Sequence, residues 1–122
     1  MKIALLGDIA PFGRFCFSEA PGLDDYFSSV REFLSPFDLV VGNLEAPFAD
    51  DESAAGCKSA HVKLHPENID LLKLLGITHV SLANNHIGDF GCDAYERTKD
   101  ALEKANISWF GTEGRQVEVR RC

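Results

Sequence analysis

Short apolar runs alternate with longer amphipathic segments along the chain. The apolar runs predict buried strands, and the segments between them carry apolar residues at the three- and four-residue spacing of a helix. This order of elements favours an α/β fold with a mainly parallel sheet, right-handed crossovers and helices on both faces. The predicted strands cover residues 2–6, 38–42, 78–83 and 107–110, and the predicted helices cover residues 23–34, 66–75 and 93–105.

Local signals mark the ends of the second and third predicted helices. Pro66 suits a first helical position, and Gly76 suits the residue that terminates a helix. Asp93 with Glu96 resembles a capping box at the start of the third helix. These signals place each helix between two predicted strands.

The remaining segments predict loops and one further strand. Residues 9–22 and 46–60 are rich in Pro, Gly and small or polar residues, which is typical of loops. Val117 and Val119 alternate with charged residues and predict a short edge strand. The basic residues of segment 115–121 are then expected to lie at this edge of the sheet, in contact with solvent.

Each of the first three predicted strands ends in polar residues. Asp8 follows the first strand, Glu45 follows the second, and Asn85 and His86 follow the third. These residues can converge, because the carboxyl ends of parallel strands face one edge of the sheet. Two carboxylates, an amide oxygen and an imidazole suit Mn²⁺, Fe or Mg²⁺, with Zn²⁺ as an alternative. Asp and Asn are also ordinary turn residues, but a turn needs no imidazole.

The remaining histidines and Asp89 have weaker signals. Asp89 follows His86 by three residues, so it could orient the imidazole ring or serve only as a turn residue. His61 and His65 are interpreted as loop surface residues, with the alternative that one lines the mouth of the cleft. His79 begins a predicted strand at the opposite edge and is interpreted as structural.

Composition restricts the classes of function. The chain has 122 residues, 45% of them apolar and nine of them Phe, which is enough for one globular domain over residues 1–122. Its 12 basic and 19 acidic residues give a net charge of −7, which disfavours binding to nucleic acid or to an anionic membrane. An anionic substrate would need local positive charge, such as a metal ion.

The short first apolar run, which lacks the length of a targeting signal, and the spacing of the cysteines predict a cytoplasmic protein. The first apolar run has only four residues, whereas a secretory leader needs roughly 7–15 and a membrane helix about 20. We therefore expect no membrane segment. The cysteines lie far apart without zinc-site spacing, and we expect mostly buried thiols at Cys16, Cys57, Cys92 and Cys122.

The polar strand ends resemble those of bacterial capsule synthesis proteins of the CapA type, also called poly-γ-glutamate synthesis proteins. That family has a calcineurin-like metallophosphoesterase fold. The resemblance extends from residue 2 to about residue 114. It is carried by Gly7-Asp8, by residues 43–47, and by residues 81–86 followed by Asp89, Gly91 and Thr98.

The resemblance implies a role for each strand-end residue. Asp8 is similar to a metal-binding aspartate, Glu45 to a carboxylate that bridges two metals, and Asn85 to a metal-binding amide. His86 is similar to the histidine that donates a proton or a hydrogen bond to the departing oxygen, with Asp89 orienting its ring. The implied cofactor is a divalent metal centre, with Mn²⁺ or Fe first and two ions as an option. The implied substrate is a phosphate ester or a polyglutamate-related molecule.

The sequence departs from the superfamily pattern in two places. Superfamily members have a histidine two residues after the first aspartate, where this chain has Ala10. They also supply histidines from a second half, and this sequence has none after His86. The match therefore resembles an N-terminal half, and we expect an open edge and an exposed apolar face. A second-half chain or a second copy would complete it.

Two main functions stay open. The first is a metal-dependent phosphoesterase-like enzyme of the capsule synthesis type. The second is a catalytically incomplete half-domain that acts as a binding or assembly module. A nucleotide-binding domain is a third, but the sequence lacks both the Walker loop and the G-x-G-x-x-G spacing.

Overall fold

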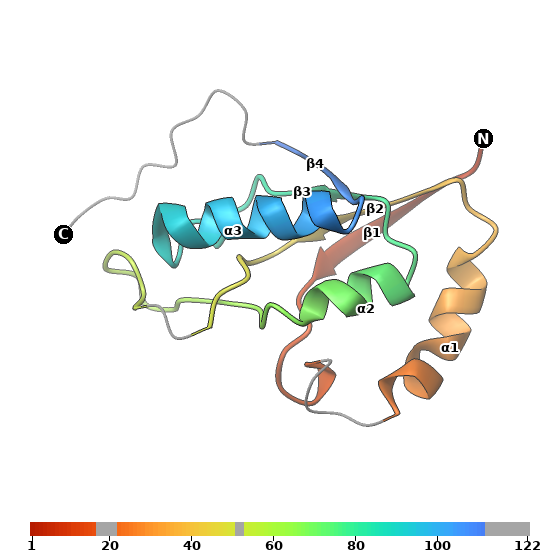
Figure 1. The fold of residues 1–122 in the computed structure, drawn as a ribbon, viewed down its shortest axis with the longest axis horizontal. Helices are drawn as coiled ribbons and strands as arrows, with labels where there is room; N and C mark the ends of the chain where they lie inside the picture. The colour runs from red at the N-terminus through yellow and green to blue at the C-terminus, as the bar shows by residue number, and fades with distance from the viewer. Residues whose placement is uncertain (17–21, 51–52, 112–122) are drawn as a thin grey trace.

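The computed structural model describes residues 1–16, 22–50 and 53–111 (Figure 1). It contains a four-stranded parallel sheet in the order β1-β2-β3-β4. The strands are β1 (Ile3–Ile9), β2 (Leu39–Leu44), β3 (His79–Ser81) and β4 (Ser108–Phe110). The helices are α1 (Leu23–Leu34), α2 (Asn68–Leu74) and α3 (Gly91–Lys104), and a short 3-10 helix, η1, covers Gly13–Phe15. The predicted α/β class and the parallel sheet are confirmed.

The predicted element order is confirmed, while several boundaries differ. Helix α1 has the predicted bounds, but β1 continues three residues further, and α2 begins at Asn68 rather than Pro66. Gly76 ends α2 as expected: its φ is 69°, and the N–H of Ile77 bonds back to the carbonyl of Leu72 at 3.0 Å.

The predicted capping box at the start of α3 is wrong. The N-cap position is held by Phe90, which makes no side-chain capping bond, and Asp93 lies inside the first turn. An acidic residue there still interacts favourably with the helix dipole, so it supports the helix from a different position. The predicted edge strand at Val117 and Val119, the basic segment 115–121 and Cys122 lie outside the described residues.

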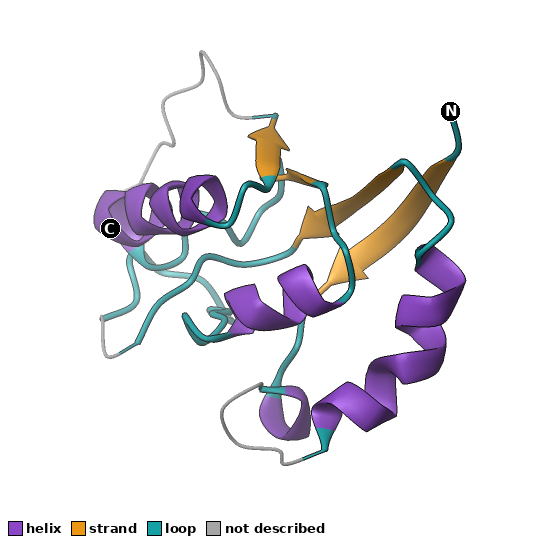
Figure 2. Ribbon diagram, turned by 45° about the vertical axis from the view of Figure 1, so that its right-hand side comes forward, coloured by secondary structure: helices purple, strands orange, loops and turns teal. Residues whose placement is uncertain are grey.

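The expectation of helices on both sheet faces is also wrong. The buried strand residues Ala4, Val40 and Val80 share one face through the parallel register, and all three α-helices contribute to the same core. Figure 2 shows the helices on one side of the strands. Each new strand is added on the same side of the previous one, so crossovers of one hand place successive helices on the same face.

The opposite sheet face is exposed and partly apolar among the described residues. Ile3 and Leu5 of β1 and Phe110 of β4 are large apolar side chains with high exposure, and Leu5 is 79% exposed. Leu5 shares its face with Val41, its partner in β2. The predicted open apolar face is therefore present.

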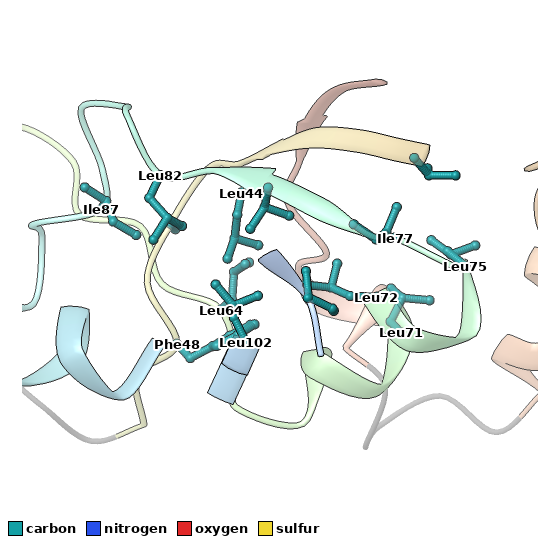
Figure 3. Close-up of a cluster of buried hydrophobic side chains, with 14 of the residues drawn as sticks. Leu44, Phe48, Leu64, Leu71, Leu72, Leu75, Ile77, Leu82, Ile87 and Leu102 are labelled. Carbon is teal, nitrogen blue, oxygen red and sulfur yellow. The ribbon is translucent and has the colours of Figure 1, made fainter. Parts of the chain in front are cut away.

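A layer of aliphatic side chains joins the helices to the sheet (Figure 3). Leu44 of β2, Leu72 of α2 and Leu102 of α3 are each 0% exposed. Burial of one such leucine side chain contributes about 1.5–3 kcal/mol. This layer fixes the strand ends that carry the polar residues.

Thr98 connects α3 to the segment that follows β2. Its hydroxyl donates to the carbonyl of Ala94 at 2.7 Å and accepts the backbone N–H of Phe48 at 2.9 Å, and the side chain is 0% exposed. The contact holds the chain just beyond Glu45.

We expect Thr98→Val to lower the free energy of unfolding by about 1–3 kcal/mol, because the Phe48 N–H is left buried without an acceptor. Urea denaturation measures the change. Ser28→Ala is the control, since the Ser28 hydroxyl donates to a local helix carbonyl, that of Asp25. Equal losses in the two variants would contradict the anchoring role of Thr98.

A β-bulge places Asp8. The register between β1 and β2 shifts between Leu5 and Asp8, where β1 carries one extra residue. Strict alternation from Ala4 would put Asp8 on the helix-covered face, but the bulge pairs it with Asn43 on the open face. Ile9 then returns to the helix side, where Gly42 leaves space: a Cβ there would lie 2.4 Å from the Ile9 Cδ1 atom.

The structure describes the state of Cys16, Cys57 and Cys92. Cys57 is disulfide-bonded, so the expected thiol is wrong at this position. Cys16 is buried and Cys92 is exposed. Cysteine spacing alone does not fix which pairs approach each other in space, so it could not predict the disulfide at Cys57.

Among the described residues, no helix has the length and apolar composition required to cross a bilayer.

Candidate functional site

Asp8 and Glu45 meet at the carboxyl ends of β1 and β2. The amide nitrogen of Asn43 donates to Asp8 Oδ1 at 2.8 Å and to Glu45 Oε2 at 2.6 Å. The backbone N–H of Glu45 also bonds to the carbonyl of Ile9 at 3.2 Å. Two carboxylates therefore converge on one hydrogen-bond donor, as expected for residues that follow adjacent parallel strands.

Asn84 joins this pair to the end of β3. Its Nδ2 donates to Asn43 Oδ1 at 3.2 Å and to the Leu44 carbonyl at 2.7 Å. Its Oδ1 accepts the backbone N–H groups of His86 and Ile87 at 3.0 and 2.9 Å. One asparagine thus uses donor and acceptor groups to hold the turn after β3 against β2.

His86 is held by Asp89. The His86 Nδ1 atom lies 2.7 Å from Asp89 Oδ2, and the backbone N–H of Asp89 bonds to the His86 carbonyl at 2.9 Å. A carboxylate only accepts, so Nδ1 carries the proton and Nε2 of the neutral ring presents a lone pair. The side chain of His86 is 19% exposed, so part of it reaches the surface.

Asp89 is a buried carboxylate with several donors. It is 0% exposed and accepts from Lys58 Nζ at 2.5 Å and from the backbone N–H of Val62 at 2.8 Å, besides the ring of His86. Burial by itself raises the pKa of Asp89, but the hydrogen bonds from Lys58, His86 and Val62 together outweigh it and hold the pKa below its ordinary value. Asp89 is therefore ionised at neutral pH.

The lowered pKa of Asp89 predicts a loss of stability in acid. A carboxyl group whose pKa is lower in the folded state stabilises the fold above its unfolded pKa of about 4, and this contribution falls as the pH drops through the folded pKa. Relative to Asp89→Asn, we expect the wild type to keep a constant advantage above about pH 5 and to lose it progressively below. Thermal unfolding of both proteins between neutral and acidic pH measures this. An advantage that grows in acid would contradict the prediction.

Asn85 occupies a different position from the carboxylate pair. Its side chain is exposed. Within the described residues, its backbone carbonyl accepts from Lys58 Nζ, whereas its side chain takes no part in the hydrogen bonds of this edge. The structure therefore brings Asp8 and Glu45 together and pairs His86 with Asp89, and it leaves the Asn85 side chain at the rim. In the described segments, no group of three or more His, Cys, Asp or Glu residues is arranged to hold a metal ion.

The other histidines have separate environments. His61 Nε2 lies 3.2 Å from the carbonyl of Ala55, and its ring is 6.4 Å from that of Phe90. His65 lines a cavity whose described lining residues include none of Asp8, Glu45, Asn85 and His86, so the alternative that a loop histidine lines the mouth of the strand-end cleft stays a prediction. His79 begins β3, with Nδ1 2.9 Å from Thr78 Oγ1, far along the sheet from the strand ends.

Three residues of the site were not predicted as ligands or catalytic residues. Asn43 and Asn84 bind the strand ends to one another, and Lys58 contacts Asp89 from the segment after β2. Asn84 had a signal, because it directly follows an apolar strand beside Asn85. Lys58 had none, since its partner lies 31 residues away in the sequence.

The comparisons with known proteins give a family. The bacterial capsule synthesis protein family, PGA_cap, matches residues 2–122. The PGA biosynthesis protein CapA of Bacillus subtilis (strain 168) is 28% identical over 114 residues, which cover 91% of this chain and 30% of that protein. The capsule biosynthesis protein CapA of Bacillus anthracis is 30% identical over 93 residues, which cover 74% of this chain and 23% of that protein.

A third relative has a related description. A probable polyglutamine synthesis accessory protein of Mycobacterium tuberculosis is 34% identical over 84 residues, which cover 69% of this chain and 22% of that protein. The chain therefore spans less than a third of the length of these relatives. The resemblance derived from the strand-end motifs is confirmed.

Proposed function

This chain belongs to the bacterial capsule synthesis protein family, and we propose that it provides a metal-dependent phosphoesterase-type site for capsule or poly-γ-glutamate synthesis. One observation carries the proposal. The carboxylates of Asp8 and Glu45 meet on the amide of Asn43, and Asn84 connects this pair to the segment that holds His86 on Asp89. Acidic ligands and an oriented imidazole are the groups that a hydrolytic metal site requires.

The donor set fits a hard divalent cation. Asp8 and Glu45 supply carboxylate oxygens, whereas the exposed side chain of Asn85 lies apart from this pair. Such oxygen donors suit Mn²⁺ or Mg²⁺ better than a soft metal. Two neighbouring carboxylates repel each other, and the Asn43 amide satisfies only one lone pair of each, so a cation between them is favourable. When bound, the metal supplies a polarised phosphoryl oxygen and an activated water.

The protein residues then perform orientation and proton transfer. Asp89 holds Nδ1 of His86, which fixes the ring with Nε2 available for the substrate. A protonated His86 donates from Nε2 to the departing oxygen, and the buried negative charge of Asp89 stabilises the imidazolium. Lys58 holds Asp89 in place and also donates to the backbone carbonyl of Asn85, so it connects the carboxylate that orients His86 to the backbone of the neighbouring Asn85.

Replacement of Glu45 tests the metal site. We expect Glu45→Ala to weaken Mn²⁺ binding by about tenfold or more, because a carboxylate ligand is lost while the fold is retained. Equilibrium dialysis against Mn²⁺ measures the affinity. Asp70→Ala is the control, since Asp70 is an exposed carboxylate of α2 that, among the described residues, pairs only with Lys73. Equal affinity in the wild type and Glu45→Ala would remove Glu45 from the site.

The open sheet face favours a second function. Exposed Ile3 and Leu5 of β1 and Phe110 of β4 lie at the two edges of the sheet face opposite the helices, which suits a non-catalytic half-domain that assembles with a second-half chain or a second copy. Such a module would work without metal. If Leu5→Lys abolishes assembly with a second-half chain or a second copy, and Mn²⁺ does not change that assembly, the assembly module replaces the enzyme as the proposed function.

A further inference from the structure

The side-chain amide of Asn43 contacts both carboxylates of the proposed metal site. Its Nδ2 atom donates to Asp8 Oδ1 at 2.8 Å and to Glu45 Oε2 at 2.6 Å, so its two hydrogens serve one carboxylate each. An asparagine amide carries N–H donors on one side and a carbonyl acceptor on the other, and a half-turn of the amide exchanges the two. What Asn43 can do at the site therefore depends on which side faces the carboxylates.

Asn84 fixes that orientation. Its Oδ1 atom accepts the backbone N–H groups of His86 and Ile87 at 3.0 and 2.9 Å, and a backbone N–H can only donate. The other arm of the Asn84 amide is therefore Nδ2, which donates to the Leu44 carbonyl at 2.7 Å and to Asn43 Oδ1 at 3.2 Å. The backbone of the turn after β3 thus determines, through Asn84, that the carbonyl of Asn43 points away from the carboxylates.

The opposite orientation of Asn43 would be unfavourable. A half-turn would place its carbonyl oxygen against the carboxylate oxygens of Asp8 and Glu45, and its N–H₂ group against the N–H₂ group of Asn84. Three hydrogen bonds would be lost, two of them to carboxylate acceptors, which form the stronger class of hydrogen bond. Asn43 therefore does not offer its carbonyl oxygen to a cation held by the two carboxylates.

The bonds from Asn43 leave the second oxygen of each carboxylate available. Within the described residues, neither Asp8 Oδ2 nor Glu45 Oε1 accepts a hydrogen bond. Asp8 is exposed and Glu45 is half-buried, so both residues reach the surface. Because a carboxylate is planar and rigid, a hydrogen bond to one oxygen also restrains the direction of the other. Hydrogen bonds of this kind orient the carboxylates that bind a metal and raise its affinity.

We propose that Asn43 is a positioning residue of the metal site. It donates to one oxygen of Asp8 and one of Glu45 and directs the remaining oxygen of each toward the ion, without binding the ion itself. Asn84 sets the direction of this donation, so two amides connect the turn that carries His86 to the carboxylate pair. This role rests on the proposed function, since it acts through the carboxylates that would hold the metal.

The Mn²⁺ affinity of Asn43→Ala tests the positioning role. We expect this variant to bind Mn²⁺ about 10–100-fold more weakly than the wild type in equilibrium dialysis, because the two carboxylates lose the donor that holds them together. Thr78→Val is the matched control. The Thr78 hydroxyl accepts the N–H of Val40 at 2.9 Å and donates to its carbonyl at 3.0 Å, so it joins β2 to β3 at the opposite ends of these strands. Loss of this contact should leave the Mn²⁺ affinity within about twofold of the wild type.

Hydrogen exchange of the Asn43 side chain tests its orientation in the wild type alone. We expect the Nδ2 hydrogens of Asn43 to exchange with water at least about tenfold more slowly than those of exposed Asn106, in ¹H–¹⁵N NMR of the metal-free protein. The same protection should persist when saturating Mg²⁺ is added. Protection that is absent without metal, or lost when Mg²⁺ binds, overturns the proposal.

The results distinguish failure of this role from failure of the metal site. A wild type that binds no Mn²⁺ overturns both. If the wild type binds Mn²⁺ and Asn43→Ala binds it equally well or more tightly, only the positioning role is overturned. Equal losses of affinity in Asn43→Ala and Thr78→Val likewise overturn it, because they indicate a general effect on the fold. If Asn43→Ala fails to fold, the exchange measurement decides.

Discussion

Asp89→Ala is expected to lower the free energy of unfolding by about 3–5 kcal/mol, a large fraction of the stability of a domain of this size. The carboxylate accepts from Lys58, from His86 and from the N–H of Val62, and the side chain is 0% exposed. Its removal takes the acceptor from the His86 ring and from the Val62 N–H, and it leaves Lys58 with the carbonyl of Asn85. Urea denaturation at neutral pH measures the loss, with unchanged slope if two-state unfolding is retained.

The matched control for Asp89 is Asp93→Ala. Asp93 is an exposed carboxylate in the first turn of α3, four residues further along the chain, and its loss should cost less than about 1 kcal/mol. Asp89→Asn should be intermediate, because an amide oxygen still accepts one hydrogen bond. If Asp89→Ala and Asp93→Ala lose equal stability, the network around Asp89 does not hold the loop after β2 against the turn after β3.

His86→Ala is expected to reduce turnover of a phosphate ester by about 10²–10⁴-fold while Mn²⁺ affinity stays within about twofold of the wild type. In the proposed mechanism His86, held at Nδ1 by Asp89, acts through Nε2, whereas the carboxylates of Asp8 and Glu45 would hold the metal. Phosphate release from monoester and diester substrates by the Mn²⁺-loaded protein measures turnover, and dialysis measures affinity.

The control for His86 is His79→Ala. His79 begins β3, at the opposite edge of the sheet, and should change neither quantity. A His86→Ala variant that loses metal and turnover together would make His86 a metal ligand rather than a proton donor. Full turnover without His86 would remove it from the mechanism.

The order of strands and helices along the chain, the helix positions and the family were predictable from the sequence because the signals are local. The apolar runs and the helical spacing define each element, and Gly76 ends α2 where its positive φ favours glycine. The alternation of strands and helices defines a parallel sheet. Asp8, Glu45 and His86 follow strands, so their location at one edge follows from the topology alone.

The side of the sheet on which each residue lies was not predictable. Helices cover one face only, because the strands are added sequentially in one direction, and this order depends on tertiary packing. The bulge before Asp8 had only one local signal, Gly7 within an apolar run. Without the bulge, Asp8 would face the helices and could not meet Glu45.

The contacts that hold the site together were also hidden from the sequence. Lys58 reaches Asp89 across 31 residues, and Thr98 reaches Phe48 across 50. Polar contacts of this separation follow no periodicity, so only the folded structure reveals them. The metal and the reaction remain proposals drawn from the donor set and the family.

Mn²⁺ content is the measurement that tests the central claim most directly. The purified chain and Asp8→Ala are loaded with Mn²⁺, freed of unbound ion and analysed for metal per chain. The account predicts about one or more Mn²⁺ ions per wild-type chain and almost none in Asp8→Ala, because the paired carboxylates form the site. A wild type that retains no Mn²⁺, or an Asp8→Ala variant that retains as much, would contradict it.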